Sequence, residues 1–412
     1  MKDGEVRQIT VASVGHIDHG KSTLLGRLLH DSGQVKPDRL SEWKKEGGNF
    51  AFLLDNFEDE QKGEMTIDIF YAQLRTKKSL FTLIDDPGHL EFIKNMLTGV
   101  SQATGVILVI SAKPGEGIQF QTKRHLMLVK LLGIEQVLVV VNKMDVVGYR
   151  QERFEEIKKE ISHFLAEVGF RAGNVVFLPV SALQGNNVYQ KLKDMPWYRG
   201  KSLYELLDEV FVPAESPVEK PLRVTLQGSF ALGSQKVLLS KIETGQIRVG
   251  QEVEFLPSGI KAKVLGIKKN YGAPVVAFPG EAVGLVMNHD FPPKVEEQII
   301  GGKENLPRVR NSATGEIFLL LDESIKLGEK LTFRCGTREI PSVISKIIRR
   351  INSETGEVIE SNAKEIKPAE MADVEIKFDY PTVVEKFTDF PSLGRFLFYK
   401  GKKNIAAGIV VD

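Results

Sequence analysis

One stretch decides the fold expected of this chain of 412 residues: Gly15-His16-Ile17-Asp18-His19-Gly20-Lys21-Ser22. It fits the pattern G-x-x-x-x-G-K-[ST] and stands between an apolar run, Ile9–Val14, that predicts a strand and a segment of helical periodicity, Ser22–His30. In such a loop the glycines let the backbone turn tightly, so that its N–H groups and the N-terminus of the helix face phosphate oxygens. A glycine-rich turn that only caps a helix is the alternative, but the flanking strand and helix favour a phosphate-binding loop.

The side chains of this loop predict how a nucleotide and its metal ion are held. Lys21 can reach the β- and γ-phosphates, and the hydroxyl of Ser22 can ligate Mg²⁺. His16 and His19 fall within the loop, and no further Cys/His cluster at metal spacing suggests a zinc site. The residues expected to contact the nucleotide here are Gly15, His16, Asp18, His19, Gly20, Lys21, Ser22 and Thr23.

A second motif, Asp85-Asp86-Pro87-Gly88-His89, follows the predicted strand Leu80–Asp85. Asp85 would stand at the carboxyl end of that strand, where doubly wound sheets bind ligands, and a carboxylate there can hold Mg²⁺. The N–H of Gly88 can approach a γ-phosphate because no side chain blocks it. His89 comes next, within reach of a water aligned with the γ-phosphate, and an imidazole can orient that water.

Two further motifs predict which base is bound. Asn142-Lys143-Met144-Asp145 follows the predicted strand Val137–Val141, and Ser181-Ala182-Leu183 follows the predicted strand Val175–Val180. The Asp145 carboxylate can accept two hydrogen bonds from the N1–H and amine of guanine, whereas adenine presents the wrong pattern. Lys143 would lie along the base, and the Ser-Ala-Leu stretch would offer a backbone N–H to the base oxygen. Either motif alone could be a helix cap after a strand, but the four motifs in this order predict GTP.

Thr66 lies between the phosphate loop and Asp85, where a GTPase keeps the loop that senses the γ-phosphate. A threonine hydroxyl on Mg²⁺ and its backbone N–H on the γ-phosphate would order that loop only while GTP is intact. The catalytic residues predicted are His89, Lys21 and Thr66, and the metal ligands predicted are Ser22, Thr66 and Asp85.

The order of segments predicts three domains. Residues 1–214 alternate apolar runs with helical segments, the pattern of an α/β domain with a mainly parallel sheet and helices on both faces. Phe211–Pro221 contains three prolines and suits an extended linker. Short strand-like segments separated by turns follow, which predict β-barrels over 215–305 and 306–412, divided at the polar stretch Gly301–Asn311. Further predicted elements are a strand at Val106–Ile110 and helices at Gln121–Leu132 and Glu152–Val168.

Composition narrows the class of protein. A formal net charge of +1 gives no broad field for nucleic acid or an anionic membrane. The single cysteine, Cys335, cannot form an internal disulfide, and we expect it to be a core or strand residue. No apolar run resembles a signal peptide or approaches the roughly 18 residues of a membrane span. These features predict a cytoplasmic protein that does not enter a membrane.

With these motifs followed by two β-domains, the whole chain resembles the translational GTPase superfamily of elongation factor Tu. Within it, the chain most resembles the GTPase large subunit of the bacterial heterodimeric sulfate adenylyltransferase. The stretches that carry this finer resemblance are Phe52–Asp55, Asp59–Gln61, Gln121–His125, Leu132–Ile134, Ser181–Val188, Met195–Gly200, Leu256–Gly259 and Leu393–Phe396.

The resemblance implies a GTPase that binds GTP and GDP with Mg²⁺ and assembles with a small ATP-sulfurylase subunit, as a heterodimer or a larger complex. GTP hydrolysis would then drive the formation of adenosine 5′-phosphosulfate from ATP and sulfate on that partner. One alternative is a translation factor that binds aminoacyl-tRNA or a release protein on the ribosome. The near-zero net charge argues only mildly against it. The short segment Ser111–Gln121 argues against it more strongly, because the eukaryotic-type factors that the chain resembles usually carry a longer insertion there. A regulatory GTPase with an unknown partner is a further alternative.

Two positions depart from the family pattern. Relatives place a glycine two residues before the switch threonine, whereas here Glu64 occupies that position and Gly63 is displaced by one. The backbone path of the switch loop should change accordingly. Asp86 adds a negative charge close to the predicted metal and phosphates, which should alter GTP affinity or Mg²⁺ retention.

Overall fold

The computed structural model describes residues 7–45, 47–54, 70–85, 103–171, 173, 175–191, 193–213, 217–233, 235–269, 272–289, 298–320 and 323–412. The chain divides into two compact units. The first comprises residues 1–214 with 353–356, and the second comprises residues 215–352 with 357–412.

The first unit is built on a sheet of six strands in the order β2-β3-β1-β4-β5-β6. The strands are β1 (Arg7–Val14), β2 (Phe70–Arg75), β3 (Ser79–Asp85), β4 (Gly105–Ser111), β5 (Gln136–Asn142) and β6 (Val175–Pro179). Five of them pair in parallel, and β2 joins the edge antiparallel to β3. The carboxyl ends of β1, β3, β4, β5 and β6 therefore meet at one edge of the sheet, which is where such sheets bind ligands.

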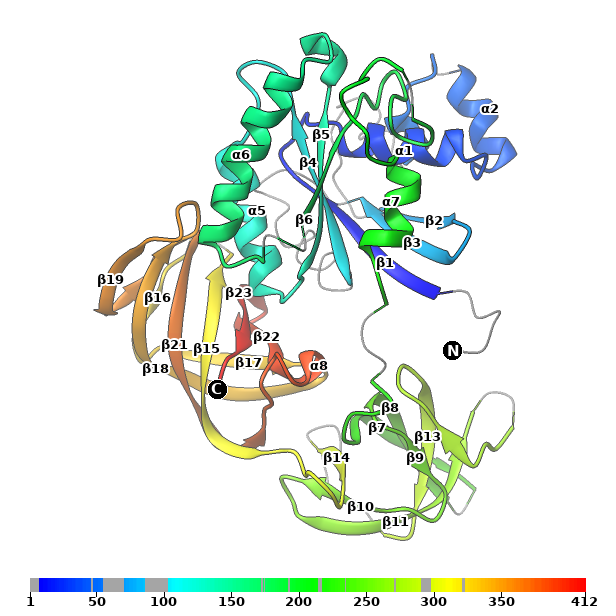
Figure 1. Ribbon diagram of the computed structural model, residues 1–412. Helices are drawn as coiled ribbons and strands as arrows, with labels where there is room; N and C mark the ends of the chain where they lie inside the picture. The colour runs from blue at the N-terminus through cyan, green and yellow to red at the C-terminus, as the bar shows by residue number, and fades with distance from the viewer. Residues whose placement is uncertain are drawn as a thin grey trace. The chain divides into compact units, whose positions relative to one another are not determined.

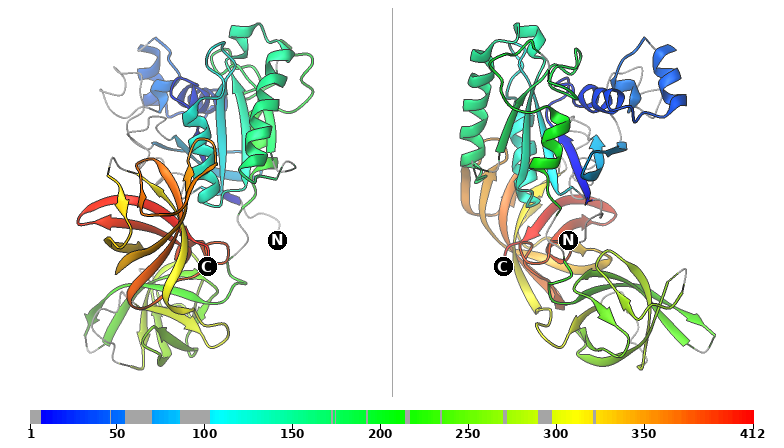
Figure 2. Two further views of the ribbon diagram at one scale, coloured as in Figure 1. Left: turned by 90° about the vertical axis from the view of Figure 1, so that its left-hand side faces the viewer. Right: turned by 45° about the vertical axis from the view of Figure 1, so that its right-hand side comes forward.

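Helices cover both faces of this sheet. α1 (Lys21–Asp31) and α7 (Leu203–Val210) lie on one face, and α5 (Phe120–Leu131) and α6 (Gln151–Glu167) lie on the other (Figures 1 and 2). The other helical segments that the structure describes in this unit are α2 (Pro37–Lys45), η1 (Ala51–Leu53) and η3 (Met144–Val147).

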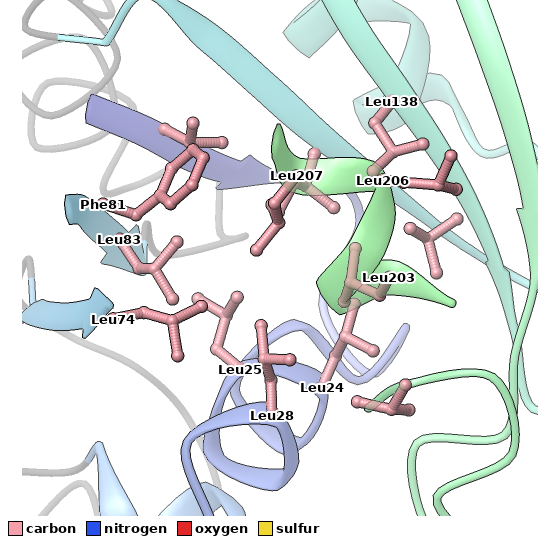
Figure 3. Packing of buried hydrophobic residues seen from close by; sticks show 14 of the residues in the cluster. Leu24, Leu25, Leu28, Leu74, Phe81, Leu83, Leu138, Leu203, Leu206 and Leu207 are labelled. Carbon is pink, nitrogen blue, oxygen red and sulfur yellow. The ribbon is translucent and has the colours of Figure 1, made fainter. Parts of the chain in front are cut away.

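α1 and α7 pack against the sheet through leucine side chains. Four leucines of α1 and three of α7 meet side chains of the sheet in one buried cluster, part of which is drawn in Figure 3. The residues labelled there are Leu24, Leu25, Leu28, Leu74, Phe81, Leu83, Leu138, Leu203, Leu206 and Leu207. Each fully buried leucine contributes about 1.5–3 kcal/mol. This packing fixes the N-terminus of α1, and with it the loop that precedes the helix, at the carboxyl edge of the sheet.

The linker predicted over Phe211–Pro221 begins later than the prolines suggested. Phe211 is fully buried, and a Cβ placed on Gly105 would lie 2.4 Å from its ring. The backbone of Val212 is held by the amide of Gln136, which accepts from its N–H at 2.7 Å and donates to its carbonyl at 3.1 Å. The start of the predicted linker is therefore packed against the first unit, because the aromatic side chain of Phe211 fills a gap that glycine leaves in β4.

The second unit begins with a closed barrel of strands in the order β10-β11-β13-β8-β7-β14 (Figure 2). The strands are β7 (Arg223–Leu232), β8 (Gln235–Thr244), β10 (Glu252–Leu256), β11 (Ile260–Lys268), β13 (Ala282–Met287) and β14 (Ile299–Gly302). A small sheet of β9 (Ile247–Arg248) and β12 (Val276–Ala277) accompanies it. Apolar side chains of alternating strand positions, among them Leu226, Phe255 and Leu285, fill the interior.

A second barrel follows in a sheet of seven strands in the order β17-β22-β23-β15-β21-β18-β19. A further pairing of β17 with β18 closes the first six of these strands, and β19 pairs with β18 outside the ring. Its elements, with a small sheet and a short helix, are β15 (Val309–Leu319), β16 (Ile325–Lys326), β17 (Lys330–Cys335), β18 (Arg338–Asn352), β19 (Val358–Ala363), β20 (Glu365–Ile366), β21 (Glu370–Val383), α8 (Pro391–Gly394), β22 (Arg395–Lys400) and β23 (Lys403–Val410). Cys335 lies in its core, as predicted, and burial raises the pKa of the thiol. An α/β domain followed by β-barrels confirms the predicted fold class.

The two barrels of the second unit share a small apolar cluster: Leu256, Ile299, Val383, Phe390 and Leu393. Beside it, the buried guanidinium of Arg223 in β7 pairs with the carboxylate of Glu385, which follows β21, at 2.6 Å. The boundary between the barrels at residues 305 and 306 stays a prediction.

Among the helices that the structure describes, none combines the length and apolarity that a membrane crossing needs.

Candidate functional site

The predicted phosphate loop connects β1 to α1, and two of its glycines occupy positions where a side chain would collide. Gly15 has a φ of 144°, and a Cβ there would lie 2.3 Å from the carbonyl oxygen of Val109 in β4. Gly20 caps α1 with a left-handed φ of 84°, and a Cβ there would lie 2.6 Å from the side-chain nitrogen of Asn142. The loop is therefore pressed against the ends of two neighbouring strands, a path that only glycine permits at these points.

Lys21 lies across this loop. Its ammonium donates to the carbonyl oxygens of Gly15 at 3.1 Å and His16 at 3.0 Å, so the charge is held against the backbone of the loop. Asp18 adopts a left-handed φ of 64° within the turn, and Thr23 stands in the first turn of α1. The structure thus brings the predicted phosphate-binding residues together at a helix N-terminus, where backbone N–H groups favour an anion.

The predicted metal ligands Ser22 and Asp85 meet at the carboxyl end of β3. The hydroxyl of Ser22 donates to one oxygen of the buried Asp85 carboxylate at 2.6 Å, and the hydroxyl of Ser13 donates to the other at 2.7 Å. A hydroxyl and a carboxylate in contact beside an anion-binding loop are the oxygen donors that Mg²⁺ prefers. The donor set therefore fits Mg²⁺. Thr66, the third predicted ligand, lies outside the described residues, as do Gly88, His89 and the departures at Gly63, Glu64 and Asp86.

Asn142, at the end of β5, connects the loop that follows this strand to two other loops. Its side-chain nitrogen donates to the carbonyl of His19 in the phosphate loop at 2.9 Å. Its side-chain oxygen accepts from the backbone N–H of Ala182 at 2.9 Å. The Ala182 N–H is thus already used within the protein. In the stretch Ser181-Ala182-Leu183, the backbone donor with no described acceptor is the N–H of Leu183, and the Leu183 side chain is 62% exposed. Ser181, in contrast, is buried and caps its own turn by accepting from Gln184 N–H at 3.2 Å.

Asp145 and Lys143 lie on the segment that leaves β5. The Asp145 side chain is half-buried and makes no hydrogen bond or ion pair with any described residue, so its carboxylate is free to accept from a base. Lys143 has a left-handed φ of 60°, and its ammonium donates to the carboxylate of Glu116 at 2.9 Å. Burial acts to raise the pKa of Glu116, but hydrogen bonds from Lys113, Ser111 and Lys143 lower it to about 2. Sequence reasoning missed Glu116, although its place just beyond a strand that ends at the nucleotide edge is a usable signal.

Three histidines lie at or beneath the phosphate loop. The ring of His19 is buried, stands 5.2 Å from the ring of His16, and has one nitrogen 3.2 Å from the carbonyl oxygen of Val109. Burial lowers the pKa of His19 to about 4. His125 of α5 is also buried, its Nδ1 has no described partner, and burial lowers its pKa to about 3. The two buried imidazoles are therefore neutral at pH 7 and contribute no positive charge to the phosphate loop. The positive charge at this loop comes from Lys21.

Comparison with known families identifies this site. Residues 6–214 match the model of the elongation factor Tu GTP binding domain, and residues 313–411 match the GTP-eEF1A C-terminal domain-like model. The chain belongs to the elongation factor Tu family of GTPases. It is thus a GTPase of the translational type, and the ligands of this family are GTP and GDP with Mg²⁺.

Curated relatives of this GTPase extend over nearly its whole length. Elongation factor 1-alpha of Aeropyrum pernix is 36% identical over 425 residues, covering 99% of this chain and 97% of the relative. The protein of the same name from Pyrobaculum aerophilum is 37% identical and covers 98% of this chain and 94% of the relative. That of Methanocaldococcus jannaschii is 36% identical, with 98% and 97% covered.

A solved structure, Sup35 complexed with GDP, is also similar. It is 25% identical and covers 100% of this chain and 95% of the other, with a TM-score of 0.46.

Proposed function

We propose that this GTPase is a translation elongation factor of the 1-alpha kind, which binds aminoacyl-tRNA in its GTP form and delivers it to the ribosome in the cytoplasm. One observation carries the proposal. Relatives named elongation factor 1-alpha are 36–37% identical to this chain and are covered over 94–97% of their length. The likeness therefore extends through the second unit as well as the GTP-binding domain.

In this proposal, different residues at the carboxyl edge of the sheet bind the phosphates, the metal ion and the base. Lys21 exchanges its two carbonyl acceptors for phosphate oxygens, and Ser22 with Asp85 holds the metal ion. Mg²⁺, when bound, supplies positive charge at the β- and γ-phosphates. Asp145 selects guanine, and Lys143 lies along the base. Thr66 and His89 keep the roles predicted for them: Thr66 orders the switch loop, and His89 orients the attacking water.

The coupling to sulfate activation, predicted first from the sequence, has less support. It rests on short stretches such as Met195–Gly200 and Leu393–Phe396. The relatives that match nearly the whole chain are, in contrast, named elongation factor 1-alpha. The small ATP-sulfurylase subunit therefore serves as the competing partner in the test.

The test compares GTP hydrolysis in two settings. In one, the protein is mixed with aminoacyl-tRNA and programmed ribosomes; in the other, with ATP, sulfate and a small ATP-sulfurylase subunit. We expect the ribosome to stimulate hydrolysis only when the tRNA is charged, and GTP rather than GDP to let the protein protect the aminoacyl ester from hydrolysis. Stimulation by the sulfate mixture alone would overturn the proposal.

A further inference from the structure

The segment between β4 and α5 forms a closed loop at the nucleotide edge of the sheet. Ser111 and Gly117 bridge across its base, and the Glu116 N–H donates to the carbonyl of Lys113 at 3.1 Å. The side-chain amide of Gln119 donates to the carbonyl of Glu116. From α6, Arg153 donates to the carbonyl of Ala112 at 3.0 Å. The loop is thus fixed from inside and from a neighbouring helix, so that the position of the Glu116 side chain is defined.

Glu116 uses both of its carboxylate oxygens. One accepts from the ammonium of Lys143 at 2.9 Å, and the other lies 2.8 Å from the ammonium of Lys113. The charge of Glu116 also acts on His19, and that of Asp18 acts on Lys113, which places this loop beside the phosphate loop. The Lys143 side chain therefore runs from the base motif towards the phosphate loop and ends on a fixed carboxylate. The Lys143 chain is thus held at both ends, by its backbone after β5 and by Glu116 at its ammonium.

We infer that Glu116 is a positioning residue for the nucleotide: by fixing the ammonium of Lys143, it holds the lysine chain along the face of guanine and slows nucleotide release. The inference rests on the proposed base site. Glu116 and Lys143 are only about a quarter exposed, at 23% and 27%, so water screens their pairing less than it would on an open surface. A free lysine would have to give up rotamer freedom each time it covered the base, whereas an anchored one has already lost it.

The test is the rate at which fluorescent GDP leaves the full-length protein, followed by stopped flow with excess unlabelled GDP. We expect Glu116→Gln to speed release about 5- to 10-fold, which corresponds to about 1–1.4 kcal/mol, the net contribution of one ordinary hydrogen bond. The matched control is Glu135→Gln. Glu135 pairs with Lys130 at 2.7 Å and stands at the opposite end of β5 from Lys143, so its loss should leave the rate unchanged.

A double-mutant cycle decides whether the effect passes through Lys143. In a Lys143→Met background, Glu116→Gln should add less than about 2-fold, and high salt should shrink the difference between wild type and E116Q. Equal acceleration in both backgrounds would overturn the inference, as would an E116Q rate within 2-fold of wild type. Since GDP release needs no ribosome, such a result would leave the proposed role in translation standing, and Asp145→Asn tests the base site separately.

Discussion

At the scale of single residues, Asp145 is the side chain on which base selection depends. Its carboxylate has no partner among the described residues, and it can accept the N1–H and amine of guanine together. Asp145→Asn replaces one acceptor with a donor, which suits the second carbonyl of xanthine. We expect the affinity for GTP to fall and that for xanthosine triphosphate to rise, as measured by competition against fluorescent GDP. The control Asp38→Asn removes an exposed carboxylate of α2 and should leave the ratio unchanged; an unaltered ratio in D145N contradicts the assignment.

His125 makes the stability of the first unit depend on pH. Burial, followed by the charges of Lys21, Arg124 and His16, lowers its pKa from 6.5 to about 3, and a hydrogen bond to the backbone of Gly15 offsets this only in part. Below about pH 6.5 this imidazole takes up a proton in the unfolded chain, whereas in the folded chain it stays neutral until about pH 3. The free energy of unfolding therefore decreases as the pH falls from 6.5 towards 3.

Between pH 7 and pH 5 this single site should cost about 2 kcal/mol of unfolding free energy. His125→Asn should lower stability at pH 7 but flatten the pH dependence by about that amount, as measured by urea unfolding at both pH values. His163→Asn changes a histidine whose side chain is 78% exposed and should leave the slope as it is. A slope that stays the same in H125N would show that other groups carry the acid sensitivity.

At the scale of elements, Asn142 joins the phosphate loop to the loop after β6. Asn142→Ala leaves the N–H of Ala182 and the carbonyl of His19 without these partners, at about 1–3 kcal/mol for each buried group. We expect GDP affinity and melting temperature to fall together, as measured by titration and calorimetry. Gln34→Ala is the matched control, because that amide also makes two backbone hydrogen bonds, to Arg75 at 2.9 and 2.6 Å, away from the loops. Unchanged affinity in N142A would mean that the loops hold their places independently.

The sequence predicted the central elements of the first unit to within one or two residues. Strands such as β4 and β5 are buried on both faces, so their β-branched runs show no alternation and few other structures fit them. α2 was missed because it buries none of its residues and so leaves no apolar face in the sequence. α7 was missed although Ser202 and Glu205 form a capping box before an apolar run, a signal that was available.

For the site, the motifs predicted which side chains meet but not how they are joined. Glu116 and His125 reach it from the loop after β4 and from α5. Glu116 belongs to no short motif, and the stretch Gln121–His125 was used only for the family resemblance. The position of Glu116 after a strand could have placed it near the nucleotide edge, but the contacts of both residues depend on packing between elements distant in the chain. The assignments of Thr66, Gly88 and His89 stay predictions.

At the scale of the whole molecule, the buried pair of Arg223 and Glu385 joins the two barrels of the second unit. Arg223 also stacks on Phe390 at 4.3 Å, so Glu385→Gln would leave a buried guanidinium without its counter-charge. Breaking such a pair costs about 3–5 kcal/mol. Glu339→Gln, which disrupts an exposed pair with Arg334, should cost less than about 1 kcal/mol.

Two optical signals separate the units in this experiment. Both tryptophans, Trp43 and Trp197, belong to the first unit, whereas circular dichroism reports the strands of both units. E385Q should therefore shift the dichroism transition in urea and leave the tryptophan transition where it is. A shift of the tryptophan transition by the same amount would show that the two units unfold as one.

The buried thiol of Cys335 has a practical consequence. It is the only cysteine of the chain, it is 1% exposed, and burial raises its pKa, so it should react slowly with maleimides at neutral pH. Cysteines introduced at exposed positions, for example at Glu160 in the first unit and Glu339 in the second, would then be the reactive ones. The natural background is thus already suited to dye pairs, and energy transfer between them would follow the two units through a cycle of GTP binding and hydrolysis without any prior removal of native thiols.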